Sequence, residues 1–471
     1  MNNEVKLNQT SSARPEAPAV ANIEVAAPQV VATLGARVTD SAAIEQLAGG
    51  QMLLWNQGCE TTGREITHNQ ITYRPVPLDP VLECSLHLPS HSAAYGTVKA
   101  LVEELAGAVS TASELDSQSA FLIATFILST WVIDALPTAA CLNPWGHDGA
   151  DASLMPTLSC LCRRPVSLST PRIGELAILP AGLTPTVILN NPAERPLQTL
   201  FAMLSEGGMV LLGGRAVSLR AALIARTRRA LDVPAVSVSL ARPHPYHRLT
   251  ATEVTALVDQ FLPRLLRFRL ERIVAVAESQ FDVSGFASPT RLVARALGST
   301  LEGFPDLQQR LVAALQISDE KMRVQQSQSL PAVVLETLLA LCHEHKTAAF
   351  VGEVTELTNS LLLGRGAGQK LTPRGLGEIL RELGLPVRRR GAGYELVLNG
   401  HQQQQLHELA ASYGVLTIRS GLAKCTLCAS VAGDGEPSEA GLRDSNGDGG
   451  MRIGNVQDVQ DVHNVPDERV S

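Results

Sequence analysis

Two short segments of this chain hold residue types that could bind a nucleotide. The first, LNPWGHDGAD at residues 142–151, ends a short apolar run and leads into an expected helix. That is the position of a phosphate-binding loop, whose glycines let backbone N–H groups approach phosphate. The second, TVILNNP at residues 186–192, ends an apolar strand where an acid would be presented to magnesium. Together the two segments indicate the architecture of a nucleotide-binding site.

The residues that carry the chemistry of hydrolysis are missing from both segments. No lysine follows Gly146 and Gly149, although a lysine normally reaches the β- and γ-phosphates. Asp151 stands at the expected helix start, where a carboxylate caps the helix itself and repels a phosphate ~4 Å away by about 4 kcal/mol. Asn190 and Asn191 are uncharged, so they are poor magnesium ligands and cannot act as a general base. We assign these five residues to a degenerate nucleotide site with little or no affinity for ATP and magnesium, and we name no catalytic residue.

An alternation of strands and helices must position these segments. Strands separated by helices pair in parallel with helices on both faces, so the expected fold class is α/β. Ligands of such sheets bind at the carboxyl ends of the strands, where Asn143 and Asn190 would lie. Each segment taken alone also fits an ordinary strand-to-helix turn or an Asn-Pro turn. We expect strands at residues 138–143, 175–179, 186–189, 209–212 and 233–240, and helices at 152–163 and 195–206.

The C-terminal part of the chain has the pattern of a winged helix, a variant of the helix-turn-helix. Three helices, at residues 331–345, 352–363 and 373–383, precede two strands at 386–390 and 394–398, and a helix at 402–413 follows. A recognition helix with a basic wing suits a major groove and its flanking phosphates. A winged helix used for protein contact is the alternative. The nucleic-acid residues we predict, on the third helix and the wing, are Lys370, Arg374, Arg381, Arg388, Arg389 and Arg390.

Charge is spread unevenly along the chain. The net charge is -7, and the segment at residues 429–471 is acidic. Arginines are concentrated between residues 215 and 272, which suits contact with a polyanion or, equally, a helix surface whose arginines lie over apolar neighbours. The apolar helix at residues 117–136 is too short and too polar to span a membrane, so we expect it to be buried between layers.

The eight cysteines are scattered and resemble reduced, buried thiols of a cytosolic protein, so we expect a cytoplasmic location and no disulfide framework. Cys425 and Cys428 form half of a zinc-binding pattern, and their partners would have to come from Cys342, His343 or His345. We assign no metal to the chain, and whether these two cysteines bind one is left open.

The order of these features resembles the helicase part of phage- and plasmid-type primase–helicases, which are P-loop ATPases. It looks especially like bacterial relatives with eroded ATPase motifs. The resemblance covers about residues 95–425 and includes the Cys162-Arg163-Arg164 triplet, the Asn-Asn strand end, the VPAVSVSL strand and the winged helix. It implies a P-loop core of the AAA+ or RecA-like kind, a helical lid and contact with nucleic acid.

We therefore expect six regions: a disordered arm (1–47), a small β-containing region (48–95), a P-loop-like α/β core (96–245), a helical lid (246–328), a winged helix (329–424) and an acidic disordered tail (425–471). The expected function is that of a helicase-related, DNA-binding protein that has lost ATP hydrolysis. One alternative is an active NTPase in which Arg226, Arg228 or Arg229 replaces the lysine. Another is a scaffold that binds neither nucleotide nor nucleic acid. A homo-oligomer is left open, and no membrane partner is expected.

Overall fold

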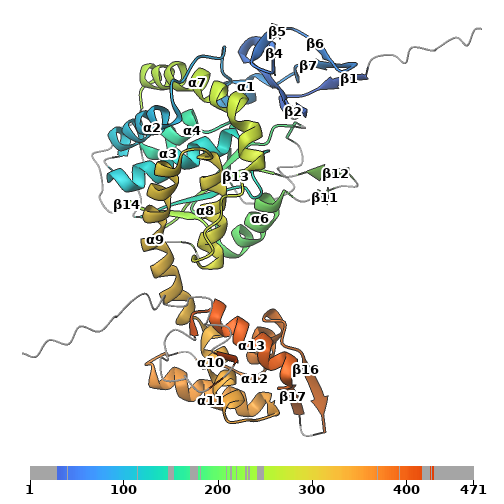
Figure 1. Cartoon of the computed structure of the whole chain (residues 1–471), viewed down its shortest axis with the longest axis vertical. Coiled ribbons are helices and arrows are strands. Elements are labelled where there is room, and N and C mark those ends of the chain that lie inside the picture. The colour runs from blue at the N-terminus through green and yellow to red at the C-terminus, as the bar shows by residue number, and fades with distance from the viewer. Residues whose placement is uncertain are drawn as a thin grey trace, which may run out of the picture.

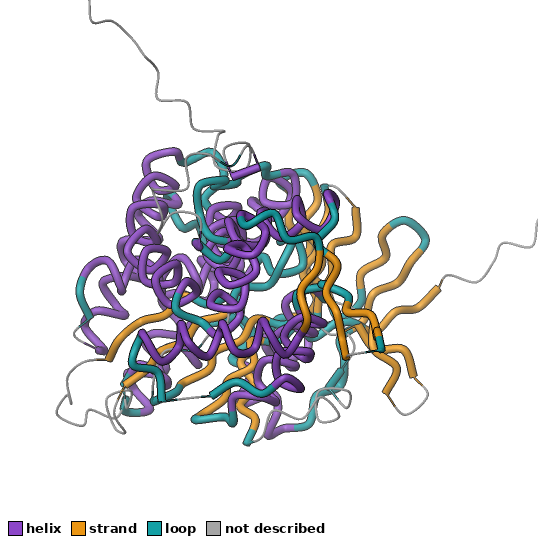
Figure 2. The backbone as a smooth tube through the Cα atoms, turned by 90° about the horizontal axis from the view of Figure 1, so that it is seen from below, coloured by secondary structure: helices purple, strands orange, loops and turns teal. Residues whose placement is uncertain are grey.

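An N-terminal β module, a helix-covered parallel sheet and a C-terminal unit follow one another in the computed structural model (Figure 1). Helix α9 leads from the sheet and its helices into the C-terminal unit (Figure 1). Seen from below, the strands of the N-terminal module gather on one side, away from most of the helices (Figure 2). The structure describes residues 29–415 apart from gaps at 40, 114, 147–152, 170–178, 181, 208, 213–214, 219, 229–230, 232–233, 241–248, 369 and 392, and it also describes residues 425, 427 and 428.

The N-terminal module contains two small sheets. One is antiparallel and consists of β2 (Gly35–Thr39), β3 (Ala42–Gln46), β4 (Met52–Asn56) and β5 (Cys59–Gly63). The other consists of β1 (Gln29–Ala32), β7 (Ile71–Arg74) and β6 (Ile66–His68), in that order. The sequence analysis expected a disordered arm up to residue 47, whereas ordered strands begin at Gln29. The reason is that every residue of β3 is buried, including Glu45 and Gln46, so the strand lacks the polar alternation that would have revealed it.

A five-stranded parallel sheet forms the centre of the molecule, which confirms the α/β class. Its strands, in spatial order, are β14 (Val236–Leu240), β8 (Cys141–Gly146), β13 (Ala222–Arg226), β10 (Thr186–Asn190) and β9 (Pro165–Leu168). Numbered in chain order, this arrangement is 5-1-4-3-2. Strands β9 and β13 were not predicted, because both are short and lie next to arginines. Arg163 and Arg164 precede β9, and Arg226 ends β13. The predicted strand at 175–179 lies outside the described residues except for its last residue.

Alternate residues of the sheet face two separate apolar cores. In β10, Val187 and Leu189 pack with α6 on one face, while Ile188 faces the larger core on the other. Helix α3 fills the centre of that larger core, since every residue from Ala120 to Trp131 is buried, as expected. None of the helices among the described residues has the length and apolar run needed to cross a bilayer.

The predicted helices at 117–136 and 152–163 are shorter in the structure, which has them at Ser117–Trp131 and Leu154–Leu161. Helices cover the sheet and lead away from it. They are α1 (Pro80–Leu86), α2 (Val98–Ser113), α3 (Ser117–Trp131), α4 (Leu154–Leu161), α6 (Glu194–Glu206), α7 (Ala251–Glu278), α8 (Ser288–Thr300) and α9 (Pro305–Ser327), with a 3-10 turn at Ala48–Gly50.

One predicted strand of the central sheet lies elsewhere. Strand β11 (Met209–Leu212) pairs antiparallel with β12 (Arg215–Ser218) in a separate hairpin. The register places Leu212 opposite Arg215, so a two-residue Gly-Gly connection joins the strands, which is a sequence typical of tight hairpins.

The C-terminal unit has its own apolar core and the three helices and hairpin that the sequence predicted. Thr372 caps the third helix, with its side chain accepting a hydrogen bond from the Gly375 N–H group. A short strand that was not predicted, β15, extends the hairpin to a three-stranded antiparallel sheet in the order β15-β17-β16. The elements are α10 (Leu330–His343), β15 (Ala348–Phe350), α11 (Val351–Gly364), α12 (Pro373–Glu382), β16 (Val387–Arg390), β17 (Gly393–Val397) and α13 (Gly400–Ser412).

Candidate functional site

The two candidate nucleotide segments end at the same edge of the parallel sheet. Gly146 closes β8 and Asn190 closes β10, and β13 lies between these strands. The Gly146 N–H group donates to the Thr227 carbonyl (3.0 Å), just after the end of β13. Gly149 and Asp151 lie outside the described residues. The fold thus brings Gly146 and Asn190 to the same edge of the sheet, whereas Asn143, which the sequence analysis expected at that edge, lies inside β8 and is buried.

Packing alone accounts for the glycine at position 146. A Cβ atom there would lie 2.6 Å from the backbone oxygen of Leu240, which is opposite Gly146 in β14. Because real Cβ atoms do not approach this closely, the neighbouring strand requires glycine whether or not a phosphate binds.

Asn143 serves the sheet itself. The side chain is fully buried, and its amide nitrogen donates to the Ala225 carbonyl (2.7 Å) and to the Thr227 hydroxyl (2.8 Å). Its amide oxygen accepts from the Leu231 N–H group at 2.9 Å. These bonds tie β8 to β13 and to the chain beyond β13, so Asn143 holds the strands in register and its amide is not presented to a ligand.

Asn190 and Asn191 lie at the open end of β10. Asn190 is exposed and stands opposite Arg226 of β13, and the Asn191 N–H group donates to the Arg226 carbonyl (2.7 Å). Asn191 has a left-handed backbone, with φ of 49°, a conformation that asparagine tolerates better than most residues. Backbone geometry is therefore one reason for asparagine at this strand end.

A cavity of about 450 Å³ opens beside the end of β8. Trp145, Ser237 and Ser239 line it from β8 and β14, and residues of α3, α8 and α9 and of the segments before α3 and β14 line the rest. The charged side chains that the described structure places in its wall are Asp116 and Lys321. One lysine beside an acid supplies little positive charge to neutralise a triphosphate.

Most of the arginines between residues 215 and 272 whose side chains the structure describes make contacts within the fold. Arg269 is fully buried, and Arg226 is 3% exposed. Arg267 also stacks over the Trp55 ring, 4.2 Å from its centroid. The observed arrangement fits the alternative in which these arginines support neighbouring elements. Among the others, Arg220 donates to the carbonyls of Leu136 and Pro137, Arg264 pairs with Glu104, Arg267 pairs with Glu60, and Arg272 donates to the carbonyl of Glu302.

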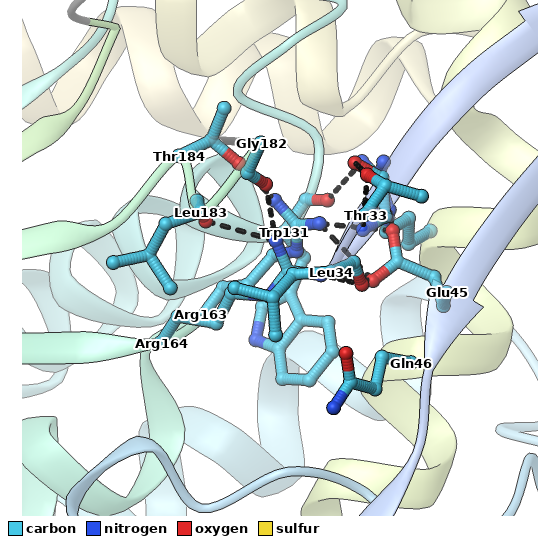
Figure 3. A network of polar contacts seen from close by, with 12 residues as sticks. Thr33, Leu34, Glu45, Gln46, Trp131, Arg163, Arg164, Gly182, Leu183 and Thr184 are labelled. Carbon is cyan, nitrogen blue, oxygen red and sulfur yellow. Dashed lines mark hydrogen bonds and ion pairs between the residues drawn. The ribbon is translucent and has the colours of Figure 1, made fainter. Parts of the chain in front are cut away.

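A buried ionic network joins the N-terminal module to the core (Figure 3). Glu45 of β3 accepts from Arg163 (2.8 Å) and Arg164 (2.7 Å), which follow α4, and from Arg269 of α7 (2.6 Å). Arg269 also forms a bidentate pair with Asp134, at 2.5 and 2.7 Å. Burial alone would raise the pKa of Glu45, but the guanidinium groups of Arg163, Arg269 and Arg164 lower it to about 2. Arg163 and Arg164 of the Cys-Arg-Arg triplet therefore connect the N-terminal module to the core, which we call a structural joint.

A basic surface remains exposed on the C-terminal unit. It consists of Lys370, α12 and the β16–β17 hairpin, and its arginines project from the helix and from the strand beside it. The side chain of Arg374 is 92% exposed and that of Arg390 is 70% exposed. Tyr394 is 55% exposed and stands opposite Arg389 across the hairpin. We call this set the basic surface; its members are Lys370, Arg374, Arg381, Arg388, Arg389 and Arg390, all of them exposed.

Acidic neighbours reduce the positive charge of this surface only in part. Arg374 pairs with Glu378 one helical turn on (3.4 Å), and Arg390 pairs with the buried Glu395 (2.9 Å). The opposite face of α12 packs into the core through Leu376 and Leu380, so the helix is held with its arginines outward. The structure thus places all six predicted residues at exposed positions of the C-terminal unit.

Comparison with known proteins gives only distant similarities. No protein-family model and no curated protein sequence matches this chain. Among solved structures, the apo A form of the NrS-1 C-terminal region is 10% identical, with a TM-score of 0.32, and the match covers 76% of this chain and 97% of that chain. Cdc6p from Pyrobaculum aerophilum is 14% identical, with a TM-score of 0.17, over 61% of this chain and 90% of that one. Drosophila ORC bound to DNA is 13% identical, with a TM-score of 0.16, over 70% and 93%.

Proposed function

We propose that this chain is a helicase-related protein that binds DNA and does not hydrolyse ATP. The observation that carries the proposal is the basic surface, where exposed cations from α12 and from β16 lie on one small folded unit. Elsewhere, between residues 215 and 272, arginines are paired within the fold, so the exposed set contrasts with the way this chain uses arginine internally.

The C-terminal unit supports this proposal by its shape. Helices α10, α11 and α12 followed by the β16–β17 hairpin match a winged helix, in which α12 is the recognition helix and the hairpin is the wing. Arg374 and Arg381 project from α12, where they would face the bases or backbone of a major groove. Arg388, Arg389 and Arg390 would contact the flanking phosphates, which fix position but do not read sequence.

The core supports the proposal that the chain does not hydrolyse ATP. The core is a parallel five-stranded sheet of order 5-1-4-3-2, which is compatible with the P-loop core that the primase–helicase resemblance implies. At the edge where such a core would hold a nucleotide, β10 ends in Asn190 and Asn191, which cannot take a proton or balance the charge of magnesium. Arg226 is buried beside Asn190 rather than directed into solvent, so it is poorly placed to replace the missing lysine.

The test is the salt dependence of DNA binding. A labelled duplex is titrated with the full chain at several salt concentrations, and binding is followed by fluorescence anisotropy. Each neutralised phosphate contributes about 0.9 to the slope of log K against log salt. Replacing Arg388, Arg389 and Arg390 together by alanine should weaken binding and reduce the slope by up to about 3.

A matched control removes the same charge from other faces. Arg64, Arg74 and Arg295 are exposed on the N-terminal module and on α8, so the R64A/R74A/R295A variant changes net charge equally. Its salt slope should equal that of the unsubstituted chain. Equal loss in both triple variants would show a non-specific charge effect and contradict the assigned surface. Failure of the unsubstituted chain to bind DNA or RNA at low salt would favour the scaffold alternative.

A further inference from the structure

Two histidines and two cysteines meet in the C-terminal unit from three separate parts of the chain. His343 is the last residue of α10, His407 lies on α13, and Cys425 and Cys428 follow α13. Each offers one ligand atom, and these four atoms all lie within 4.8 Å of one another. His407 and Cys428 are buried, while His343 and Cys425 are partly buried. The group is therefore a compact cluster shielded in large part from solvent.

Three distances within the cluster match those of a tetrahedral metal site. The Nε2 atoms of His343 and His407 are 3.4 Å apart. The Cys425 sulfur lies 3.4 Å from His407 Nε2, and the Cys428 sulfur lies 3.3 Å from His343 Nε2. Around zinc, with bonds of ~2.0–2.1 Å to nitrogen and ~2.3 Å to sulfur, the N–N and N–S edges of a tetrahedron are about 3.3–3.6 Å long. The three separations above match these edges, and the others are at most 4.8 Å, so small side-chain movements bring all four atoms within bonding distance of one ion.

A hydrogen bond of the His407 ring determines the protonation of the ring nitrogen that faces the cluster. His407 Nδ1 lies 2.6 Å from the Gln403 carbonyl oxygen, which can only accept, so Nδ1 carries the proton. In the neutral ring Nε2 then bears a lone pair and points at His343 and Cys425. A ligating histidine commonly donates its other N–H group to a backbone carbonyl in this way.

We infer that His343, His407, Cys425 and Cys428 form a structural zinc site. Two thiolates and two neutral imidazoles around Zn²⁺ give a site of zero net charge, which suits a largely buried position. Four protein ligands leave no open position, so the site is structural rather than catalytic. Soft thiolates together with imidazoles favour zinc over magnesium or calcium.

The sequence analysis reached three of these four residues, Cys425, Cys428 and His343. It named Cys342, His343 and His345 as candidate partners of the cysteine pair, and His343 alone belongs to the cluster. His407 was missed because it lies 64 residues after His343, and both histidines precede the cysteines. In the usual zinc-binding sequence pattern, the second pair of ligands follows the first pair at a short, fixed distance. No such spacing pointed to a histidine of α13 here.

The site would fasten the end of the C-terminal unit to its first helix. Cys428 and His343 are 85 residues apart in the chain, and zinc would close that loop and hold α13 against α10. The core of this unit, which includes Leu406 of α13, also supports α12 and the hairpin. Metal binding should therefore stabilise the unit that presents the basic surface, although the zinc site stands independently of DNA binding.

The experiment measures metal content and ligand type in the full chain. Protein is produced with zinc in the medium, kept reduced and dialysed without chelator, and zinc is quantified by elemental analysis. We expect about one zinc per chain. Replacing zinc by Co²⁺ should give the strong absorption of tetrahedral cobalt together with thiolate-to-cobalt charge transfer. This spectrum uses the unsubstituted chain, so it tests the inference even if a variant does not fold.

Matched variants assign the ligands. C425S, C428S and H407Q should each lose zinc, with a more than tenfold lower affinity in a competition titration against a chelator. The controls are C84S, which removes an exposed thiol on α1, and H401Q, which removes an exposed histidine on α13; both should retain one zinc. Absence of zinc from the unsubstituted chain, a cobalt spectrum without thiolate charge transfer, or retention of zinc by the three ligand variants would each overturn the inference.

Discussion

Replacing Glu45 by glutamine should strongly destabilise the joint between the N-terminal module and the core. Glu45 is 4% exposed and receives hydrogen bonds from Arg163, Arg164 and Arg269. Glutamine has nearly the same size but no charge, so three buried guanidinium groups would be left with Asp134 as their one remaining carboxylate in this network. Removing one partner of a buried ionic group typically costs about 3–5 kcal/mol. We expect the free energy of unfolding to fall by that amount.

Tryptophan fluorescence during urea unfolding measures this effect selectively. The three tryptophans are Trp55, Trp131 and Trp145, all of them before the C-terminal unit, so fluorescence reports on the N-terminal module and the core. Trp131 lies within the network, because its backbone carbonyl accepts from Arg269 at 2.8 Å. With a slope of about 2–3 kcal/mol/M, the expected loss moves the midpoint by about 1–2 M urea.

The control is Glu65→Gln, which removes an equal charge from an exposed position in the same module. It should change stability by less than about 0.5 kcal/mol. A loss below about 1 kcal/mol for Glu45→Gln, the range of an exposed ion pair, would refute the assignment of this network as a structural joint.

Three further predictions concern pH, nucleotide and the C-terminal segment. The fold lowers the pKa of Glu45 from 4.5 to about 2, so its ionised carboxylate stabilises the folded state above pH 4.5, and this stabilisation is lost as the pH falls toward 2. Urea midpoints should therefore drop across this pH window in the unsubstituted chain, and less steeply in Glu45→Gln. Mg-ATP at millimolar concentration should not raise the melting temperature of the core, since a ligand far below its dissociation constant adds negligible stability, and a rise of several degrees would favour the active-NTPase alternative. Removing residues 429–471, which are acidic, should tighten DNA binding at low salt, and unchanged affinity would show that this segment does not compete for the basic surface.

The sequence predicts the elements of the C-terminal unit well because their signals are local. Thr372, Pro373 and Gly384 mark the ends of α12, and the exposure of its arginines follows from the apolar positions that alternate with them. Helix α3 was equally clear, since a predominantly apolar segment of that length is typical of a buried helix.

The parts that the sequence did not predict depend on contacts between distant segments. Glu45 fell in the expected disordered arm, because its partners Arg163 and Arg269 lie more than a hundred positions away in the chain. The same holds for Arg226, which is basic in the sequence but buried at a strand end. His407 belongs to a metal cluster only because α13 folds back on α10. In each case the role of the residue depends on contacts with distant parts of the chain, which the local sequence pattern does not contain.

The most direct test of the central claim is to map where DNA contacts the chain. A labelled duplex is photo-crosslinked to the full chain at low salt, and the modified peptides are identified by mass spectrometry. The proposal predicts crosslinks on α12 and on the β16–β17 hairpin, with Tyr394 beside Arg389 as the expected aromatic acceptor. Crosslinks confined to the parallel-sheet core, or none at concentrations where binding is measured, would contradict it.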